Sequence, residues 1–502
     1  EDSVPEAFLG YTSRYDLSQN LPEMTLLNSK WMSIYPTSYE LVNLELERAM
    51  AMSQPLDTAL LDKVLAQITA KSHPVADIHR LIVASRFQTT PTAAQRQIIA
   101  HALVQLEPKI KVRKLPQDSD WDDRVTEMYT ALVKQDSELT AAILQEPDFG
   151  LPGHVIFAAL FQTEQFPAMA AAFVNKVKTV PDYQWSSDVV FLLGGSPDES
   201  MRDLVRTQFD NFALRNSVLI ALSESPNPGD RDKFIEALDN SPVDVMAECV
   251  KALLRLPPSD SALENVALLR AFRKLSPVDQ ERQVRDQLEE LLRLNLGQNF
   301  GYQAGQDGDV QTPIVEKWTA FIQQRFPDEY ARQSGSSLEG IEELKQMLTQ
   351  VDWSRGDAAH GEQIFAQRAC VQCHSARRAL GPDLQGVASR FSREDLFTAI
   401  MLPNRDVSPR YQTTLIETKD GRIFTGMVVY EAIDGVVIRN AANQSFRIEM
   451  DQIESRKPLS TSLMPNGLLK DLKPRDYADL YAYLRTLKVS TAQSSDDRRV
   501  VE

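Results

Sequence analysis

Three residues within a stretch of five have the types and spacing to do chemistry: Cys370, Cys373 and His374, in the pattern Cys-X-X-Cys-His. Two thiols three residues apart on one helical turn can reach the two vinyl groups on one edge of a porphyrin. The adjacent imidazole can then ligate the iron from the same side. The pattern therefore predicts one covalently attached haem c, with iron bound by His374.

Two other uses of paired cysteines fit this sequence less well. A structural zinc site takes about four ligands, and the one other cysteine of the chain, Cys249, lies far away in an apolar helical stretch. A thioredoxin-like redox pair needs a βαβ setting, whereas the pattern around Cys370 is helical. We expect Cys249 to be a buried small hydrophobe.

The segment Gly381-Pro382-Asp383-Leu384 follows the histidine closely. In c-type cytochromes a proline in this region turns the chain beneath the ring. A carbonyl there can accept the Nδ1–H of the proximal histidine, which fixes the orientation of the imidazole and tunes the iron. Pro382 is therefore predicted to belong to the haem site.

The sixth iron ligand must come from elsewhere, and five residues are candidates: Met401, Met427, Met450, Met464 and His360. Met401 lies on an apolar helix, Met427 and Met450 lie in predicted strands, and packing is the simpler role for all three. His360 precedes the motif on the same helix, from which it hardly reaches the opposite face of the ring. Met464 lies in a loop that Pro465 stiffens, so we favour Met464.

The elements that must position these residues are read from the hydrophobic pattern. Gly361 and Phe365 are four residues apart on the helix that enters the motif, and a closing helix over 477–487 offers apolar side chains to pack against them. A small residue opposite an aromatic one lets two helices cross closely. Between these helices, alternating apolar residues and two Asp-Gly pairs predict antiparallel strands at 411–418, 422–430, 436–440 and 445–450, a β insertion over about 411–453.

Several motifs together resemble the haem-binding domain family best known from planctomycetes and related bacteria. They are GDAAHGEQIF, CVQCH, GPDLQGVASRFSREDLFTAI, PNRDVSPRY, DGRIFTG, SLMPNGLL and DLYAYLRTL, from about Gly356 to Leu487. The resemblance implies a monohaem cytochrome with a β insertion before the distal methionine, which falls on Met464. Upstream, residues 35–51 look like the start of the helical repeats that precede this domain in relatives, many of which also carry a β-propeller resembling sugar or alcohol dehydrogenases.

The rest of the chain reads as helical, which makes the expected fold mainly α. Apolar residues at spacings of three and four predict helices over 41–52, 78–87, 96–106, 124–144 and 155–177. Between 202 and 296 the helices come in pairs at a spacing that suits a HEAT-like solenoid, with an irregular bundle as the alternative. The expected domains are an N-terminal extension (1–37), HEAT-like repeats (38–340), a class I-like cytochrome c domain (341–490) and a flexible tail (491–502).

Charge and hydropathy narrow the classes of partner. The 502 residues carry a net charge of −16, which argues against nucleic acid. Residues 351–490 hold 19 basic and 17 acidic side chains, so the acidic excess lies elsewhere. We find no apolar run of the roughly 18 residues that span a bilayer. Because residue 1 is Glu, we expect a mature or trimmed product without its leader.

These features predict a protein that moves electrons rather than an enzyme. Because c-type haem is attached outside the cytoplasmic membrane, a periplasmic or otherwise extracytoplasmic location is expected. The partner is expected to be a redox protein; the alternative is that this chain is the electron-accepting subunit of a dehydrogenase. Arg377-Arg378 is expected to guide an acidic partner, with two solvated arginines as the alternative. In a third interpretation the helical part is a scaffold and the haem a sensor. His79, Asp77 and His154 are interpreted as ordinary residues rather than metal ligands.

Overall fold

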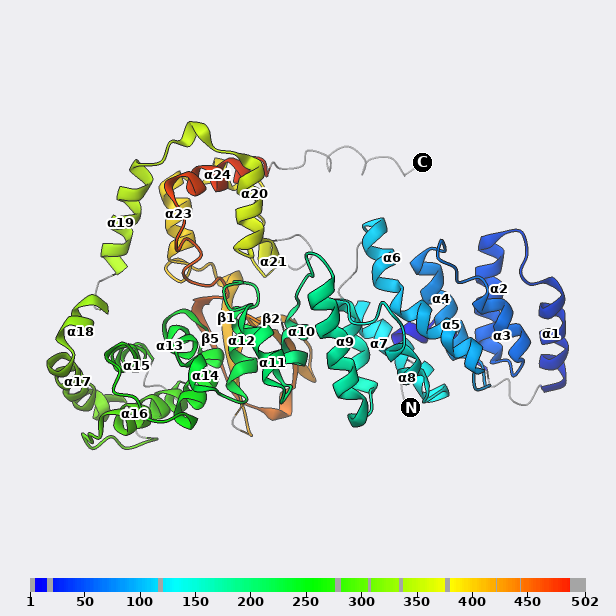
Figure 1. Ribbon diagram of the computed structural model, residues 1–502, viewed down its shortest axis with the longest axis horizontal. Helices are drawn as coiled ribbons and strands as arrows, with labels where there is room; N and C mark the ends of the chain where they lie inside the picture. The colour runs from blue at the N-terminus through cyan, green and yellow to red at the C-terminus, as the bar shows by residue number, and fades with distance from the viewer. Residues whose placement is uncertain are drawn as a thin grey trace. The chain divides into compact units, whose positions relative to one another are not determined.

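The computed structural model describes residues 5–15, 21–115, 121–275, 281–305, 308–333, 337–374, 380–420, 422–442 and 444–487. By its contacts the chain divides into two units, Glu1–Leu192 (unit 1) and Leu193–Glu502 (unit 2), and helix α10 (Ser187–Gly194) spans the division. Helices dominate both units, as the sequence predicts, and none of the helices in the described part is long and apolar enough to cross a membrane (Figure 1).

Unit 1 is a succession of helices in which alternate helices pack on one another. Its α-helices are α1 (Leu21–Ile34), α2 (Glu40–Ser53), α3 (Thr58–Leu65), α4 (Pro74–Ser85), α5 (Ala93–Val104), α6 (Leu106–Arg113), α7 (Trp121–Gln135), α8 (Leu139–Leu144) and α9 (Phe166–Thr179). Helix α2 packs on α4 and α4 on α7, while α3 packs on α5 and α5 on α8. Apolar side chains of these helices, such as Leu61, Leu81 and Ile99, are buried.

Two of the predicted helices in unit 1 are wrong in extent. The predicted helix over 124–144 is broken into α7 and α8, because the Asp136 carboxylate accepts the N–H of Glu138 and the guanidinium of Arg96 between them. The predicted helix over 155–177 is a 3₁₀ segment (Pro152–Leu160) followed by α9, which begins with Phe166-Pro167. Pro167 has no backbone N–H to continue a preceding helix, so it favours a helix start.

The helical part of unit 2 repeats this arrangement. Its helices are α11 (Glu199–Arg206), α12 (Arg215–Ser223), α13 (Arg231–Asn240), α14 (Val243–Arg255), α15 (Ala262–Lys274), α16 (Arg282–Leu296), α17 (Gly308–Arg325) and α18 (Pro327–Gln333). Helices α12, α14 and α16 stack in one row, and α13, α15 and α17 in the other. Cys249 lies on α14 with no exposed surface, which confirms the expected buried hydrophobe. The HEAT-type assignment and the domain boundary near 340 stay predictions.

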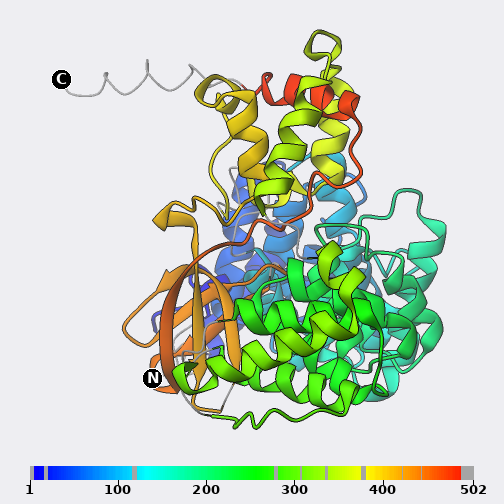
Figure 2. The same ribbon diagram turned by 90° about the vertical axis from the view of Figure 1, so that its left-hand side faces the viewer.

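The C-terminal part of unit 2 combines short helices with one sheet. The helices are α19 (Ser337–Thr349), α20 (Ala358–Gln367), α21 (Cys370–His374), α22 (Val387–Arg390), α23 (Arg393–Met401) and α24 (Pro474–Leu484). Figure 2 shows α24 lying across α20. Phe365, Phe397, Tyr477 and Leu480 are among the buried side chains of their shared core. The predicted tail after 490 and the pair Arg377-Arg378 lie outside the described residues.

The predicted sheet is present, and it is one strand larger than expected. Its strands are β1 (Gln412–Thr418), β2 (Ile423–Glu431), β3 (Gly435–Arg439), β4 (Ser445–Glu449) and β5 (Ile453–Ser462), all antiparallel in the order β4-β3-β2-β1-β5 (Figure 2). Strand β5 extends the insertion past the expected end at 453, and its sequence does not predict a strand, because this edge strand has no buried residue and contains Pro458. Met450 is also misplaced, since it begins a 3₁₀ turn after β4.

Candidate haem site

The attachment motif forms its own short helix, α21, after a sharp turn in the chain. Helix α20 ends at Gln367, and Ala369 takes a left-handed backbone conformation (φ 60°) that redirects the chain into Cys370. The Cys370 side chain packs against the core between α20 and α24. Cys373 packs instead into a separate small cluster with Leu380, Met427 and Leu463. The two sulfurs thus face two different parts of the domain.

The expected hydrogen bond beneath the motif is present. His374 donates its Nδ1–H to the carbonyl oxygen of Pro382 at 2.8 Å. Burial lowers the pKa of His374, against the opposing effect of this hydrogen bond, and so favours the neutral ring. With Nδ1 committed to the carbonyl, the lone pair of Nε2 is the one left for a metal.

Gly381 makes room for the imidazole. A Cβ at this position would lie 2.8 Å from Cε1 and 2.9 Å from Nδ1 of His374. The N–H of Gly381 also donates to the carbonyl of Cys373 at 2.9 Å, which closes the loop back onto the motif. The two thiols, the oriented imidazole and this missing side chain fit a haem bonded through Cys370 and Cys373.

Residues 358–427 match the family model for cytochrome c. This part of the chain is a cytochrome c domain. The match runs from the first residue of α20 into β2 and so includes the attachment motif. The cytochrome c domain carries covalently bound haem c with its iron, and its role is haem-based electron transfer. No curated protein matches the chain.

The helix crossing that supports the cytochrome c domain is built as the sequence predicts. A Cβ on Gly361 would overlap the backbone of Asp479 in α24 and lie 2.8 Å from the Cβ of Tyr483. The rings of Phe365 and Tyr483 are 5.2 Å apart beside this contact. The crossing therefore holds the helix that leads into Cys370 against the closing helix.

His360, a candidate sixth ligand, takes part in the same crossing. Its Nδ1 lies 2.8 Å from Oδ2 of the buried Asp479, whose other carboxylate oxygen accepts the N–H of Asp357 at 2.6 Å. The ligand atoms of His360, Asp476 and Asp479 lie within 4.8 Å of one another, a grouping that the sequence analysis missed because it joins residues on two helices. The hydrogen bonds of His360 and Asp479 link α20 to α24.

The loop with Met464 is anchored at its start by residues that the sequence analysis did not single out. The backbone N–H of Met464 donates to Oγ of Ser462 at 3.0 Å, and the N–H of Ser462 donates to Oδ1 of Asn404 at 2.8 Å. Leu463, beside Met464, is buried in the cluster that contains Cys373. Asn404 belongs to the PNRDVSPRY segment, which was the only signal for it in the sequence.

Three other methionines were candidates for the iron. Met401 packs partly buried against the core between α20 and α24, as expected. Met450 is 39% exposed. Met427 lies in β2 as predicted, but its side chain enters the same cluster as Cys373 and Leu463. Met427 is therefore a closer rival to Met464 than its position in a strand suggested.

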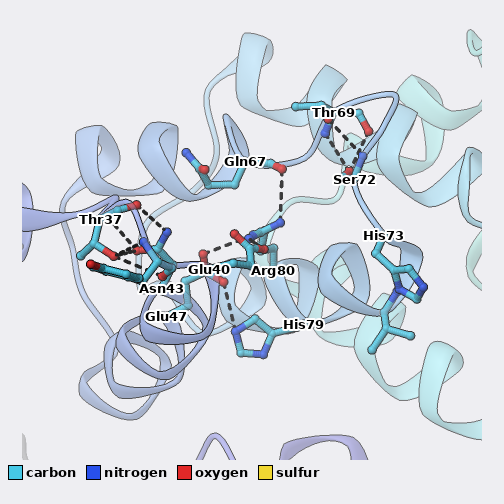
Figure 3. Close-up of polar contacts among 12 residues, drawn as sticks. Thr37, Glu40, Asn43, Glu47, Gln67, Thr69, Ser72, His73, His79 and Arg80 are labelled. Atoms are coloured by element: carbon cyan, nitrogen blue, oxygen red, sulfur yellow. Dashed lines mark hydrogen bonds and ion pairs between the residues drawn. The ribbon is translucent and has the colours of Figure 1, made fainter.

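His79 lies in unit 1 beside Glu47 and Arg80 (Figure 3), and Asp77 lies on the same helix, α4. Nε2 of His79 lies 3.1 Å from a carboxylate oxygen of Glu47, and Nδ1 lies 2.8 Å from the hydroxyl of Tyr11. Asp77 accepts from the ammonium group of Lys109 at 2.6 Å. These contacts tie both residues to neighbouring side chains, and their interpretation as ordinary residues rather than metal ligands stays a prediction.

Proposed function

We propose that this chain is an extracytoplasmic monohaem cytochrome in which Met464 is the sixth iron ligand. The observation that carries the ligand assignment is the packing of Leu463 with Cys373 and Leu380. This packing holds the Met464 loop beside one attachment cysteine and the segment beneath His374. A thioether opposite an imidazole favours Fe(II) and raises the reduction potential, which suits an electron acceptor. It also fills the last coordination position, so the iron relays electrons rather than binding substrate.

Met464 is favoured over Met427 as the ligand because Met464 lies in a loop, whereas Met427 lies in a paired strand. Met427 is paired with Arg439 across β2 and β3 and is itself a buried member of the cluster. Met464 is half-buried in a loop that is anchored on one side by Ser462 and followed directly by Pro465. A side chain outside the regular sheet is easier to orient toward a ligand, and Pro465 limits the movement of the loop.

Two isosteric variants test this assignment. In Met464→Leu, the weak near-infrared sulfur-to-iron band is expected to disappear and the midpoint potential to fall. In Met427→Leu, the band is expected to persist. Both substitutions keep the apolar volume, so an effect on the band reports ligation rather than packing. Loss of the band in Met427→Leu and its retention in Met464→Leu would move the ligand to Met427.

The wider assignment rests on the motifs around the site. We propose that the domain belongs to the haem-binding domain family known from planctomycetes, because its motifs extend from Gly356 to Leu487 and include the Met464 loop. The extracytoplasmic location follows from where c-type haem is attached. Fractionation of cells that produce the coloured protein tests the location, since colour confined to the cytoplasm would contradict it.

The helical part is proposed to be a HEAT-like surface that docks the redox partner. The two rows of stacked helices in each unit support this proposal, because such stacks present extended faces to a partner. A dehydrogenase is the partner class to test, with this chain as its electron acceptor. Rapid mixing of the oxidised protein with reduced candidate dehydrogenases should reduce the haem. Redox-dependent partner affinity without haem reduction would instead favour a sensor.

A further inference from the structure

Arg368 lies where three segments of unit 2 meet. It follows α20 and precedes Cys370 by two residues. Its guanidinium donates from Nη2 to the carbonyl oxygen of Lys470 at 2.9 Å. The same guanidinium lies over the ring of Phe212, with Cζ 5.1 Å from the ring centroid. Arg368 thus contacts the Met464 side of the domain and the helical part at once.

The hydrogen bond to Lys470 ties two distant segments of the haem site. Lys470 belongs to the turn that follows Met464, in which the N–H of Lys470 donates to the carbonyl of Gly467 at 2.9 Å. Gly467 and Asp471 have positive φ angles of 82° and 63°, so the turn has a defined shape. Arg368 and Lys470 are 102 positions apart in the sequence. The segment that precedes Cys370 is therefore bonded to the segment that follows Met464.

Phe212 brings the helical part into this arrangement. It lies in the connection between α11 and α12, and its ring faces the guanidinium of Arg215 at 4.4 Å as well as that of Arg368. Arg215 is itself bonded to Glu236 of α13 at 3.2 Å. Stacking of a cation on an aromatic ring restricts the guanidinium plane and so the direction of its hydrogen bonds. The position of Phe212 thus affects how Arg368 holds Lys470.

The charge of Arg368 also acts on the attachment site. The guanidinium of Arg368 carries its positive charge two residues before the attachment cysteine Cys370. A cation near the haem disfavours the additional positive charge of Fe(III). Removing the charge should therefore lower the midpoint potential.

We propose that Arg368 is a positioning residue through which the helical part controls the Met464 loop and, with it, the reduction potential of the haem. This inference rests on the proposed ligation by Met464. Displacing the Phe212 ring frees the guanidinium, loosens the turn at Lys470 and weakens the hold on the thioether.

The test compares four variants of the full-length protein with haem attached. They are Arg368→Met, Arg368→Lys, Phe212→Leu and Phe209→Leu. Phe209 is the matched control, because it lies in the same connection and its ring faces Arg215, at 5.0 Å, and Lys233, at 5.7 Å, rather than Arg368. The measurements are the midpoint potential, the temperature at which the near-infrared band disappears, and hydrogen exchange of residues 465–472.

Arg368→Met is expected to lower the potential, to lose the band at a lower temperature and to speed exchange in the turn by about tenfold. Arg368→Lys should recover most of the potential, because it keeps the charge, but not the slow exchange, because it lacks the planar fork. Phe212→Leu should speed exchange and lower the temperature of band loss, and Phe209→Leu should match the wild type.

Each contrary result overturns a stated step. If Arg368→Met or Phe212→Leu behaves like the wild type, Phe212 and Arg368 do not control the Met464 loop. Equal effects of Phe212→Leu and Phe209→Leu would lead to the same conclusion. If Arg368→Met does not mature, Phe212→Leu still decides, because it is remote in sequence from the attachment motif. Exchange of the turn is read without the near-infrared band, so failure of Met464 as ligand is distinguishable from failure of the coupling.

Discussion

The backbone of Asp479 runs so close to Gly361 that a methyl group at Gly361 would overlap its carbonyl group. This contact sets the crossing of α20 and α24, and the buried Asp479 carboxylate reinforces it through His360 and the N–H of Asp357. Because α20 leads directly into Cys370, the geometry of the attachment site depends on this crossing.

Gly361→Ala is expected to destabilise the cytochrome c domain by about 1–3 kcal/mol, the usual cost of forcing extra volume into a packed contact. Denaturant unfolding followed at the haem absorption band measures the effect. Gly229→Ala is the control, since a Cβ there would meet its nearest neighbour, Oδ1 of Asn227, at an ordinary 3.4 Å. Equal stability of the two variants would mean that α24 moves away from α20 without cost.

Gly381→Ala is expected to raise the midpoint potential. The added methyl group displaces the His374 ring and weakens its hydrogen bond to the Pro382 carbonyl. That bond increases electron density on the imidazole and so stabilises Fe(III). Spectroelectrochemical titration measures the change. Pro382→Ala keeps the carbonyl and should stay near the wild-type potential, whereas an unchanged or lower potential in Gly381→Ala would contradict this role for the hydrogen bond.

Asn404→Ala is expected to loosen the start of the Met464 loop. It removes the acceptor for the Ser462 N–H, with a cost of about 1 kcal/mol. Hydrogen exchange at Ser462 and Leu463 should become faster, and the near-infrared band should disappear at a lower temperature. Asn404→Asp retains an acceptor oxygen and should behave like the wild type. Wild-type exchange in Asn404→Ala would show that the loop is held by other contacts.

His154 should make unit 1 sensitive to acid. The ring has 2% of its surface exposed, accepts the N–H of Gly150 at Nδ1 and donates from Nε2 to the carbonyl of Val104. Burial lowers its pKa to about 4, although the bond to Val104 opposes this. In the unfolded chain His154 therefore binds a proton near pH 6.5, whereas in the folded unit it does so only near pH 4. The contribution of the neutral His154 ring to the free energy of unfolding is fully present above pH 6.5. It falls by about 3 kcal/mol as the pH drops to about 4.

The measurement is hydrogen exchange of residues 139–179 at pH values between 7 and 4.5, corrected for the intrinsic rates. His154→Gln should remove most of the acid-induced loss, because an amide does not titrate in this range. His101→Gln, which replaces an exposed ring in the same unit, should keep the loss. An acid loss that persists undiminished in His154→Gln would assign it to other groups.

The sequence by itself determined the cofactor chemistry and most of the local structure of this protein. Haem attachment by Cys370 and Cys373 depends on residues within one helical turn. The hydrogen bond from His374 to the Pro382 carbonyl depends on a short loop, so both features follow from local spacing. The predicted strands before β5 also follow from local alternation. The helical periodicity identified most helices but missed the breaks at Asp136 and Phe166, where side-chain hydrogen bonding and a proline override it.

Tertiary structure decided what joins segments that are distant in the chain. The edge strand β5 is stabilised by pairing with β1 rather than by an apolar pattern, so its own residues do not predict a strand. The entry of Met427 into the cluster with Cys373, the anchoring of Met464 through Asn404, and the position of Arg368 between Phe212 and Lys470 all depend on how strands and helices pack. These contacts join segments that are distant in the sequence, and the two contacts of Arg368 each join residues more than a hundred positions apart. Contacts of this kind leave no periodic signal in the sequence.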